Sequence, residues 1–300
     1  MYGRMANVPV EFKIRPLFSA LSVGAGKVEA DFDIREFDIA LTSPVSDVKT
    51  YYVDPVNGTS GGVGTEEDPI DSLARVGLKE LGAPSAEPVL EIIAKPYKYD
   101  QSTILAAAIS GITKSYSLRR WGETGKIKQL QGRWGDSQSW SDLGGGVWSA
   151  SLTNCVSVFD ESITNDIGDA SFYNKVGSDL DNISGTWFQD GGTLKIHTID
   201  GREPDINIGI GRLIANYLID SSVTTADIYC EDVEFLGGLK AMQLSVATST
   251  SNIRWFNNRC KFMYGQTNGQ EAEGHTLVIN ENCVGAYNGS DGFNYHSNTS

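Results

Sequence analysis

Near the start of the chain, hydrophobic residues recur at every second position. This happens in two places: at Phe12 and Ile14, and then at Val28, Ala30, Phe32 and Ile34, followed after a one-residue slip by Phe37, Ile39 and Leu41. Period-two alternation is typical of half-buried strands, and the slip indicates a bulge or a turn. The polar stretch 42–47 has the composition of a linker. The pattern therefore predicts a small, separate β module over residues 1–48.

A longer repeat appears in the second half of the chain. Four short strands align over 205–208, 232–235, 259–262 and 282–285, so their second positions advance by 27, 27 and 23 residues. A repeat of this length is typical of a chain that stacks one structural unit on the next. One turn of a parallel β-helix uses a similar length. We therefore predict an all-β protein with regular coils over 205–300, which we expect to continue past residue 300.

The residue types at the aligned positions agree with stacked strands. The inward positions would form two columns, Ile206, Val233, Cys260 and Cys283 in one, and Ile208, Phe235 and Phe262 in the other. A free cysteine behaves as a small buried hydrophobe, so these thiols need no redox role. Asn257 and Asn280 are expected to stack as part of an asparagine ladder.

The outward positions of the same strands pair opposite charges. Asp232 would lie beside Arg259, and Glu234 beside Lys261. Such pairs on neighbouring strands stabilise a sheet by a few tenths of a kcal/mol to about 1 kcal/mol. Each carboxylate therefore has a structural role available to it, which weighs against a catalytic one.

Two further segments resemble a known family. The phrase YYVDPVNGT, followed by EDPIDSL, covers 51–59 and 67–73, and the segment 185–197 has the pattern of a hairpin turning at Asp190-Gly191-Gly192. Both resemble right-handed parallel β-helix proteins of the pectate-lyase-like class, including bacteriophage tailspikes. The resemblance implies that a strand and a short helix cap the open end of the coil. Residues 49–204 would form this capping and irregular β region.

The resemblance also implies a function. Tailspikes of this family bind, and in some cases depolymerise, a bacterial surface polysaccharide, and they assemble as homotrimers. Residues 1–48 would then attach the spike to other tail or baseplate proteins of the virion. Three hypotheses remain open: a depolymerising tailspike, a non-catalytic virion fibre or adhesin, and a bacterial polysaccharide lyase or glycoside hydrolase.

Charge and composition exclude several other classes. The formal net charge of −14 disfavours nucleic acid and anionic membranes as partners. No apolar run approaches the ~18 residues of a membrane span, and the start lacks the pattern of a secretory signal. We therefore expect assembly in a host cytoplasm, and the family resemblance implies a final place in the virion tail. Four cysteines without metal-ligand spacing predict neither a disulfide scaffold nor a metal site, and no cofactor is expected.

Candidate chemistry lies in two segments near the end of the chain. The loop 270–275 places Glu271 and Glu273 close together, as glycoside hydrolysis by paired carboxylates requires. The segment 287–296 interleaves aromatic and polar residues, as sugar recognition often does. The predicted catalytic residues are Glu271, Glu273 and Asp291, and the predicted substrate-binding residues are His275, Tyr287, Phe293, Tyr295 and His296. A solvated acidic loop and an ordinary turn and strand explain the same letters.

Overall fold

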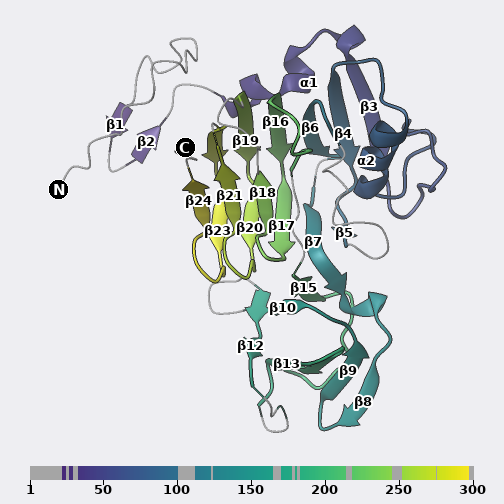
Figure 1. Cartoon of the computed structure of the whole chain (residues 1–300), viewed down its shortest axis with the longest axis vertical. Helices are drawn as coiled ribbons and strands as arrows, with labels where there is room; N and C mark the ends of the chain where they lie inside the picture. The colour runs from purple at the N-terminus through teal and green to yellow at the C-terminus, as the bar shows by residue number, and fades with distance from the viewer. Residues whose placement is uncertain are drawn as a thin grey trace.

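The fold is a right-handed parallel β-helix with an antiparallel insertion (Figure 1). The computed structural model describes residues 22–24, 27–29, 33–100, 112–122, 124–164, 170–177, 180, 183–213, 218–244, 252–274 and 276–296; residues 22–24, 27–29 and 296 are described by their backbone alone. No helix within these ranges is long and apolar enough to cross a lipid bilayer.

Three parallel sheets form the faces of the coil. Sheet 1 contains β3 (Val48–Val53), β4 (Val89–Ala94), β6 (Ser115–Arg120), β16 (Thr225–Glu231), β19 (Asn252–Asn258) and β22 (Thr276–Glu281). Sheet 2 contains β5 (Lys98–Tyr99), β7 (Ile127–Trp134), β17 (Val233–Gly237), β20 (Lys261–Met263) and β23 (Val284–Ala286). Sheet 3 contains β18 (Met242–Leu244), β21 (Gln270–Glu273) and β24 (Phe293–His296). From β16 onward the chain visits the three sheets in turn, which is the winding that the repeat predicted.

The predicted register is confirmed from residue 233 to the last described strand. Phe235 lies opposite Phe262, and Phe262 opposite Gly285, so the offsets are 27 and 23 residues. The side chains of Val233, Phe235, Cys260 and Phe262 are fully buried. All four cysteines are free thiols, as expected. The amide of Asn257 donates to Asn280 Oδ1 over 2.8 Å, which confirms the asparagine ladder.

The first member of each predicted column is wrong. Ile206 is 37% exposed, and Ile208 begins an antiparallel strand, β15 (Ile208–Arg212), outside the stack of parallel rungs. The position beside Val233 is occupied by Ile127 instead. The segment 205–208 has the alternation of a rung, but it belongs to a large insertion, and β17 pairs with β7 instead. Sequence spacing could not reveal that the chain leaves the coil after β7 and returns at β16.

The insertion is a small antiparallel unit between β7 and β16, drawn in the lower half of Figure 1. Its strands are β8 (Ser141–Gly144), β9 (Val147–Ser151), β10 (Cys155–Thr164), β11 (Ala170–Phe172), β12 (Asn174–Lys175), β13 (Thr186–Asp190), β14 (Thr193–His197) and β15. The predicted hairpin is confirmed as β13 and β14, which turn at Gly191-Gly192. A separate hydrophobic cluster around Trp187 and Leu194 stabilises the unit.

The insertion is joined to the coil through sheet 2. Strand β15 pairs antiparallel with the second half of β7, and β10 pairs with β15 in turn. Gly132 permits this approach, since a Cβ at that position would lie 1.8 Å from the carbonyl oxygen of Ile210. The coil and the insertion therefore share one continuous sheet.

The beginning of the chain differs from its predicted strands. Residues 22–24 and 27–29 form a short hairpin of β1 and β2, but Ile34–Phe37 is a 3-10 helix (η1) and Ile39–Thr42 is a short α-helix (α1). The strand prediction for 34–41 is therefore wrong, because the carboxylates of Asp33 and Asp38 cap these helices through backbone N–H groups. The alternating positions Phe12 and Ile14 lie outside the described residues.

Helix η1 lies on the outer face of sheet 1. Ile34 is buried against Tyr229 and Phe256, and the Phe37 ring stacks on Phe256 with centroids 4.5 Å apart. The apolar positions that suggested a strand are thus used to cover a sheet face. A further 3-10 turn, η2 (Val45–Asp47), leads directly into β3.

The capping strand and helix are present at the end of the coil formed by the earliest rung. Strand β3 is the edge of sheet 1, and the loop after it returns to form a bridge between Val53 and Ile70. Helix α2 (Leu73–Gly82) then buries Leu73 and Val76 against the same core. The Tyr51 hydroxyl donates to Glu80 over 2.7 Å. The core is thereby covered at an edge that would otherwise be open.

Single residues in the left-handed conformation turn the corners between sheets. Asp232, Arg259 and Asn282 have φ of 59°, 54° and 54°, and each lies between a strand of sheet 1 and the next strand of sheet 2. Asp and Asn tolerate this conformation, whereas a residue such as Arg pays about 1–2 kcal/mol for it. At Arg259, two hydrogen bonds to Asp232, of 3.0 and 2.8 Å, offset this conformational cost. The predicted pairs Asp232–Arg259 and Glu234–Lys261 are both confirmed.

Truncation of the central ring tests the stacking. Phe262 is fully buried between Phe235 and Phe293, with ring centroids 5.2 and 6.0 Å away. We expect Phe262→Ala to lower the free energy of unfolding by about 3–5 kcal/mol in urea titrations. Leu143→Ala, at an exposed position of the insertion, is the control and should change it by less than about 0.5 kcal/mol. Equal stability of the two variants would contradict the register.

Asp232 gives the fold a defined acid sensitivity. Burial opposes its charge, but hydrogen bonds from Arg259 and Lys126 outweigh burial and lower the pKa of Asp232 from 3.8 to about 2. A lowered folded-state pKa stabilises the fold above about pH 4, and this stabilisation is lost as the pH falls toward 2. Its size is on the order of 2 kcal/mol. We expect Asp232→Asn to be less stable than wild type at pH 6, and the difference to shrink between pH 4 and 2. A constant difference over that range, or the same narrowing in the exposed control Asp142→Asn, would refute this role.

Candidate functional site

The predicted catalytic glutamates lie on the outer face of sheet 3. In β21, Gln270 and Ala272 point into the coil beside Met242 and Leu244, so Glu271 and Glu273 point outward on the same face. Residues two apart on one face of a strand are neighbours, so the two carboxyl groups lie close together. The prediction of a loop at 270–275 is wrong for Gln270–Glu273, which form a strand, and the catalytic role of the two glutamates stays a prediction.

Glu271 has the surroundings of a structural ion pair. It is only 3% exposed, and its carboxylate accepts hydrogen bonds from Lys240, Asn268 and Gln243. Burial opposes its charge, but the bonds from Lys240 and Asn268 prevail and lower the pKa of Glu271. A general acid needs the opposite shift, so this environment suits an anion that positions Lys240.

Asp291 is brought near Glu271 through the backbone. Its carbonyl accepts a 2.9 Å bond from the Gly269 N–H, and its own N–H lies 3.4 Å from Asn268 Oδ1. Its side chain is exposed. His275 and the side chain of His296 lie outside the described residues, so their predicted roles remain predictions.

The predicted aromatic residues are used for packing. Phe293 and Tyr295 are in register with Gln270 and Ala272, which places them on the inward face of β24. Phe293 packs on Phe262, and the Tyr295 hydroxyl donates to Gln270 over 2.9 Å. Tyr287 turns a corner at φ 55° and stacks on Tyr264. These contacts favour structural roles over sugar binding.

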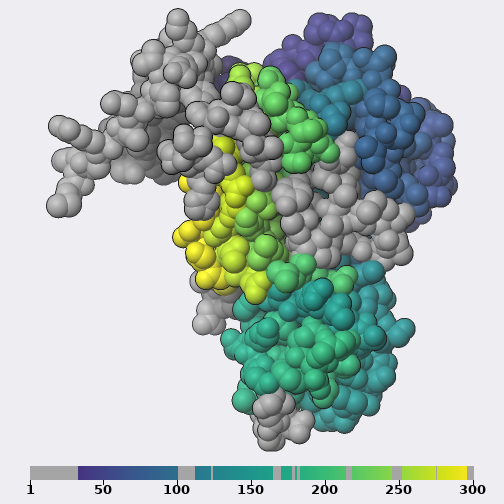
Figure 2. Space-filling model, in the orientation of Figure 1, coloured from purple at the N-terminus to yellow at the C-terminus, as the bar shows by residue number. Residues whose placement is uncertain are grey.

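A groove that the sequence did not predict lies between the coil and the insertion. It has a volume of about 150 Å³, is open to solvent, and lies between the outer face of sheet 2 and β10. Its lining residues include Lys128, Glu161, Glu234, Lys261 and Tyr264. In Figure 2 the insertion, in teal, meets the green and yellow coil along this junction.

A row of charged residues runs along the outer face of sheet 2 and into this groove. Lys98, Lys128, Glu234 and Lys261 occupy matching outward positions on four successive rungs of sheet 2. Glu161 of β10 reaches across, 2.9 Å from Lys98 and 2.8 Å from Lys128. Lys128 also lies 3.8 Å from Glu234, which in turn lies 3.6 Å from Lys261. We call these five residues the charge row.

The charge row holds two carboxylates close to a single ammonium group. Glu161 and Glu234 come from different structural units, and Lys128 contacts both. Ion-paired side chains of this kind are held in place and still present hydrogen-bonding groups to the groove. Such carboxylates and ammonium groups bind hydroxyl groups by hydrogen bonds, and glycoside hydrolysis also uses a pair of carboxyl groups.

Tyr264 lines the groove and belongs to an aromatic cluster between the coil and the insertion. Tyr264 stacks on Phe159 of β10 with centroids 4.1 Å apart, and on Phe172 of β11 at 5.9 Å. Tyr264 is 2% exposed, so its ring fixes the insertion against the coil. Of the residues predicted to bind substrate, Tyr287 is the one that the structure places in this aromatic cluster.

The sequence predicted two of the five residues of the charge row as a pair. The repeat correctly paired Glu234 with Lys261, but Glu161, Lys128 and Lys98 belong to segments outside the aligned strands. Their approach depends on the pairing of β15 with β7, which no sequence pattern revealed. Among the described residues there is no cluster of three or more His, Cys, Asp or Glu placed to hold a metal ion.

Comparison with known proteins bears on the fold. No family model matches the chain, and no curated protein matches it. A solved structure described as a glycoside hydrolase is similar to it, with a TM-score of 0.50 over 79% of this chain and 67% of the other. The fold is shared with that protein. The two sequences are 11% identical, so the likeness concerns the architecture.

The structural role of Glu271 can be tested directly. We expect Glu271→Gln to lower the free energy of unfolding by about 1–3 kcal/mol, because Lys240 loses its charged acceptor in a nearly buried position. Glu66→Gln, at an exposed position, should leave it unchanged within about 0.5 kcal/mol. Urea titration of both variants makes the measurement. Wild-type stability of Glu271→Gln would return this residue to the list of catalytic candidates.

Proposed function

We propose that this chain is a tailspike-like virion component that binds a bacterial surface polysaccharide, with the groove as the binding site. The observation that supports this best is the charge row, four of whose residues line an open polar groove on the outer face of a long parallel sheet. Sugars have many hydroxyl groups, and fixed carboxylates and ammoniums bind them by hydrogen bonds. The interior of the coil is apolar, so ligands bind on its outer faces.

The rest of the proposal follows from the family resemblance. Residues 1–48 attach the spike to other virion proteins, and the chain acts as a homotrimer in the virion tail. A non-catalytic fibre or adhesin of the virion would use the same groove for attachment alone.

A second candidate function is depolymerisation of the same polysaccharide. It is favoured by the presence of two carboxylates in one groove, and by a structural neighbour described as a glycoside hydrolase. In the two-carboxylate mechanism, one group protonates the leaving oxygen and the other acts as base or nucleophile. Glu161 and Glu234 are the residues to which these roles would fall.

Acid-to-amide variants of the groove separate binding from cleavage. We expect Glu161→Gln and Glu234→Gln each to weaken binding of host capsule or lipopolysaccharide by about tenfold or more, because each loses a charged acceptor for sugar hydroxyls. If the groove is catalytic, wild type also releases reducing ends, and both variants lose about 10²-fold or more of that activity.

The matched control for this experiment is Glu203→Gln, an exposed acid of the insertion outside the groove. It should bind and cleave as wild type does. Unchanged binding by both groove variants, with melting temperatures equal to wild type, would refute the groove as the site. Binding without new reducing ends or unsaturated products would leave the adhesin function and exclude the enzyme.

A further inference from the structure

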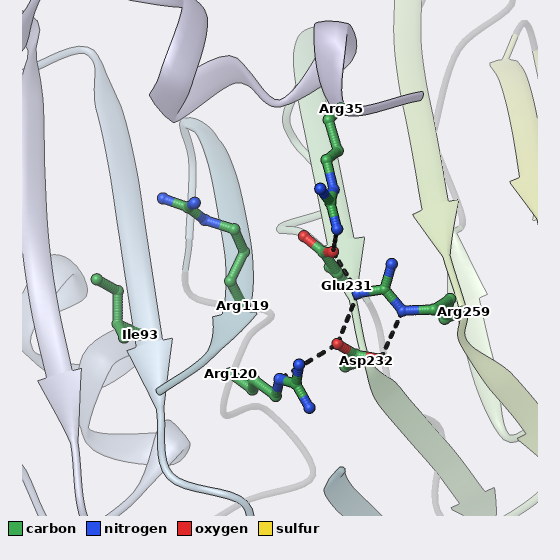
Figure 3. Close-up of a pocket in the computed structure, with 7 residues that line it drawn as sticks. All are labelled: Arg35, Ile93, Arg119, Arg120, Glu231, Asp232 and Arg259. Carbon is green, nitrogen blue, oxygen red and sulfur yellow. Dashed lines mark hydrogen bonds and ion pairs between the residues drawn. The ribbon is translucent and has the colours of Figure 1, made fainter. Parts of the chain in front are cut away.

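A second cavity lies at the corner between sheets 1 and 2, on the side covered by η1. Its volume is about 190 Å³. Figure 3 shows its lining, which draws side chains from η1, β4, β6, β16 and the corners that follow β16 and β19: Arg35, Ile93, Arg119, Arg120, Glu231, Asp232 and Arg259. Four guanidinium groups thus gather around two carboxylates in a chain whose net charge is −14.

Positive groups prevail here even when the surrounding partners are counted. Lys126 pairs with Asp232, which adds a fifth cation. Arg119 is held by Asp38 and Glu91, which brings the acids to four. These five cations and four acids leave an excess of one positive charge around the cavity.

The two acids of the cavity have no acceptor capacity to spare. Glu231 accepts from Arg35, Arg259, Tyr229 and Asn258. Asp232 accepts two bonds from Arg259 and one from Lys126, and it also pairs with Arg120 at 3.4 Å. A carboxylate offers about four lone-pair sites, so both groups are saturated.

The arginines, by contrast, keep donors in reserve. A guanidinium has five N–H donors. The bonds of Arg35 to this network use one nitrogen, Nη2, and its side chain is 55% exposed. Arg120 uses Nε toward Asp232 and Nη1 toward the Gly125 carbonyl. Among the described residues, their other N–H groups have no partner and can donate to an acceptor that enters the cavity.

The arrangement is also held in place before any ligand binds. Arg259 adopts φ 54°, a conformation that disfavours arginine, and its two bonds to Asp232 fix the guanidinium beside Glu231. The same conformation recurs at the corner residues Asp232 and Asn282, so it belongs to the turn between the sheets, and the bonds to Asp232 are what hold the guanidinium in place. Arginine forks bind carboxylate and phosphate groups in pairs of parallel hydrogen bonds.

We infer that this cavity binds an oxyanion, a carboxylate or a phosphate group. Resting on the proposed function, the inference makes the polysaccharide an acidic one, whose charged substituent enters between Arg35 and Arg120. A neutral glycan would leave these donors without an acceptor. The cavity lies on a different outer face from the groove, so a long acidic chain, or a second one, would be bound here independently of the charge row.

Small anions test the site without any need for the natural glycan. We expect calorimetric titration of the full chain with glucuronate and with inorganic phosphate to show saturable binding that weakens as salt rises, and titration with glucose to show none. The variant Arg35→Gln with Arg120→Gln should bind either anion at least tenfold more weakly. Asp232 and Glu231 keep Arg259 as a partner in this variant, so the fold should be retained.

The control removes the same charge elsewhere. Arg75→Gln with Arg254→Gln abolishes two ion pairs outside the cavity and should bind as wild type does. Saturable binding of one anion alone would identify the acidic substituent as carboxylate or phosphate. Absence of saturable binding by wild type, or equal binding by the cavity variant, would overturn the inference. If the proposed function is wrong and this inference is right, the wild-type chain binds the small anions but does not bind the bacterial polysaccharide.

Discussion

The structure depends on the stacking of inward side chains between consecutive rungs. Each rung buries a column residue only because the rung before it and the rung after it supply apolar neighbours at the same position. Phe262 illustrates this: Phe235 covers its ring from the same position of the preceding rung, and Phe293 of sheet 3 covers it from the following rung, where the matching position is Gly285. Strand spacing of about 4.8 Å sets how closely such residues stack. Every other feature of the protein has to be compatible with this column.

One consequence is that all chemistry is displaced to outward positions. Outward residues on successive rungs are also neighbours, so like charges repel and opposite charges pair along a sheet. Both candidate sites follow this rule. In the charge row, Glu234 lies between Lys128 and Lys261, and Glu161 of β10 pairs with the neighbouring ammonium groups of Lys98 and Lys128. The arginine cavity forms where the corner residues Asp232 and Arg259 come together.

A second consequence is that additional structure can be attached without disturbing the core. The insertion leaves after β7 and returns at β16, and the rungs on either side of it pair directly, as Ile127 beside Val233 shows. The insertion contributes Glu161 to the groove and fixes its own position by stacking Phe159 on Tyr264. The helical segment over sheet 1 does the same at the other site, where it supplies Arg35.

The sequence alone determined the rung register from residue 233 onward, the free thiols, the asparagine ladder, the hairpin at 186–197 and the paired charges Asp232–Arg259 and Glu234–Lys261. These features depend on residues that are one repeat apart or adjacent in a hairpin, so spacing and residue type suffice to predict them. The partners of Ile127, Lys128 and Glu161 were decided by tertiary structure. Ile127 and Lys128 lie opposite residues about a hundred positions further along the chain, and Glu161 reaches Lys128 from some thirty positions away. The path of the insertion brings these residues together. For the same reason Ile206, which has the alternation of a rung, lies outside the coil.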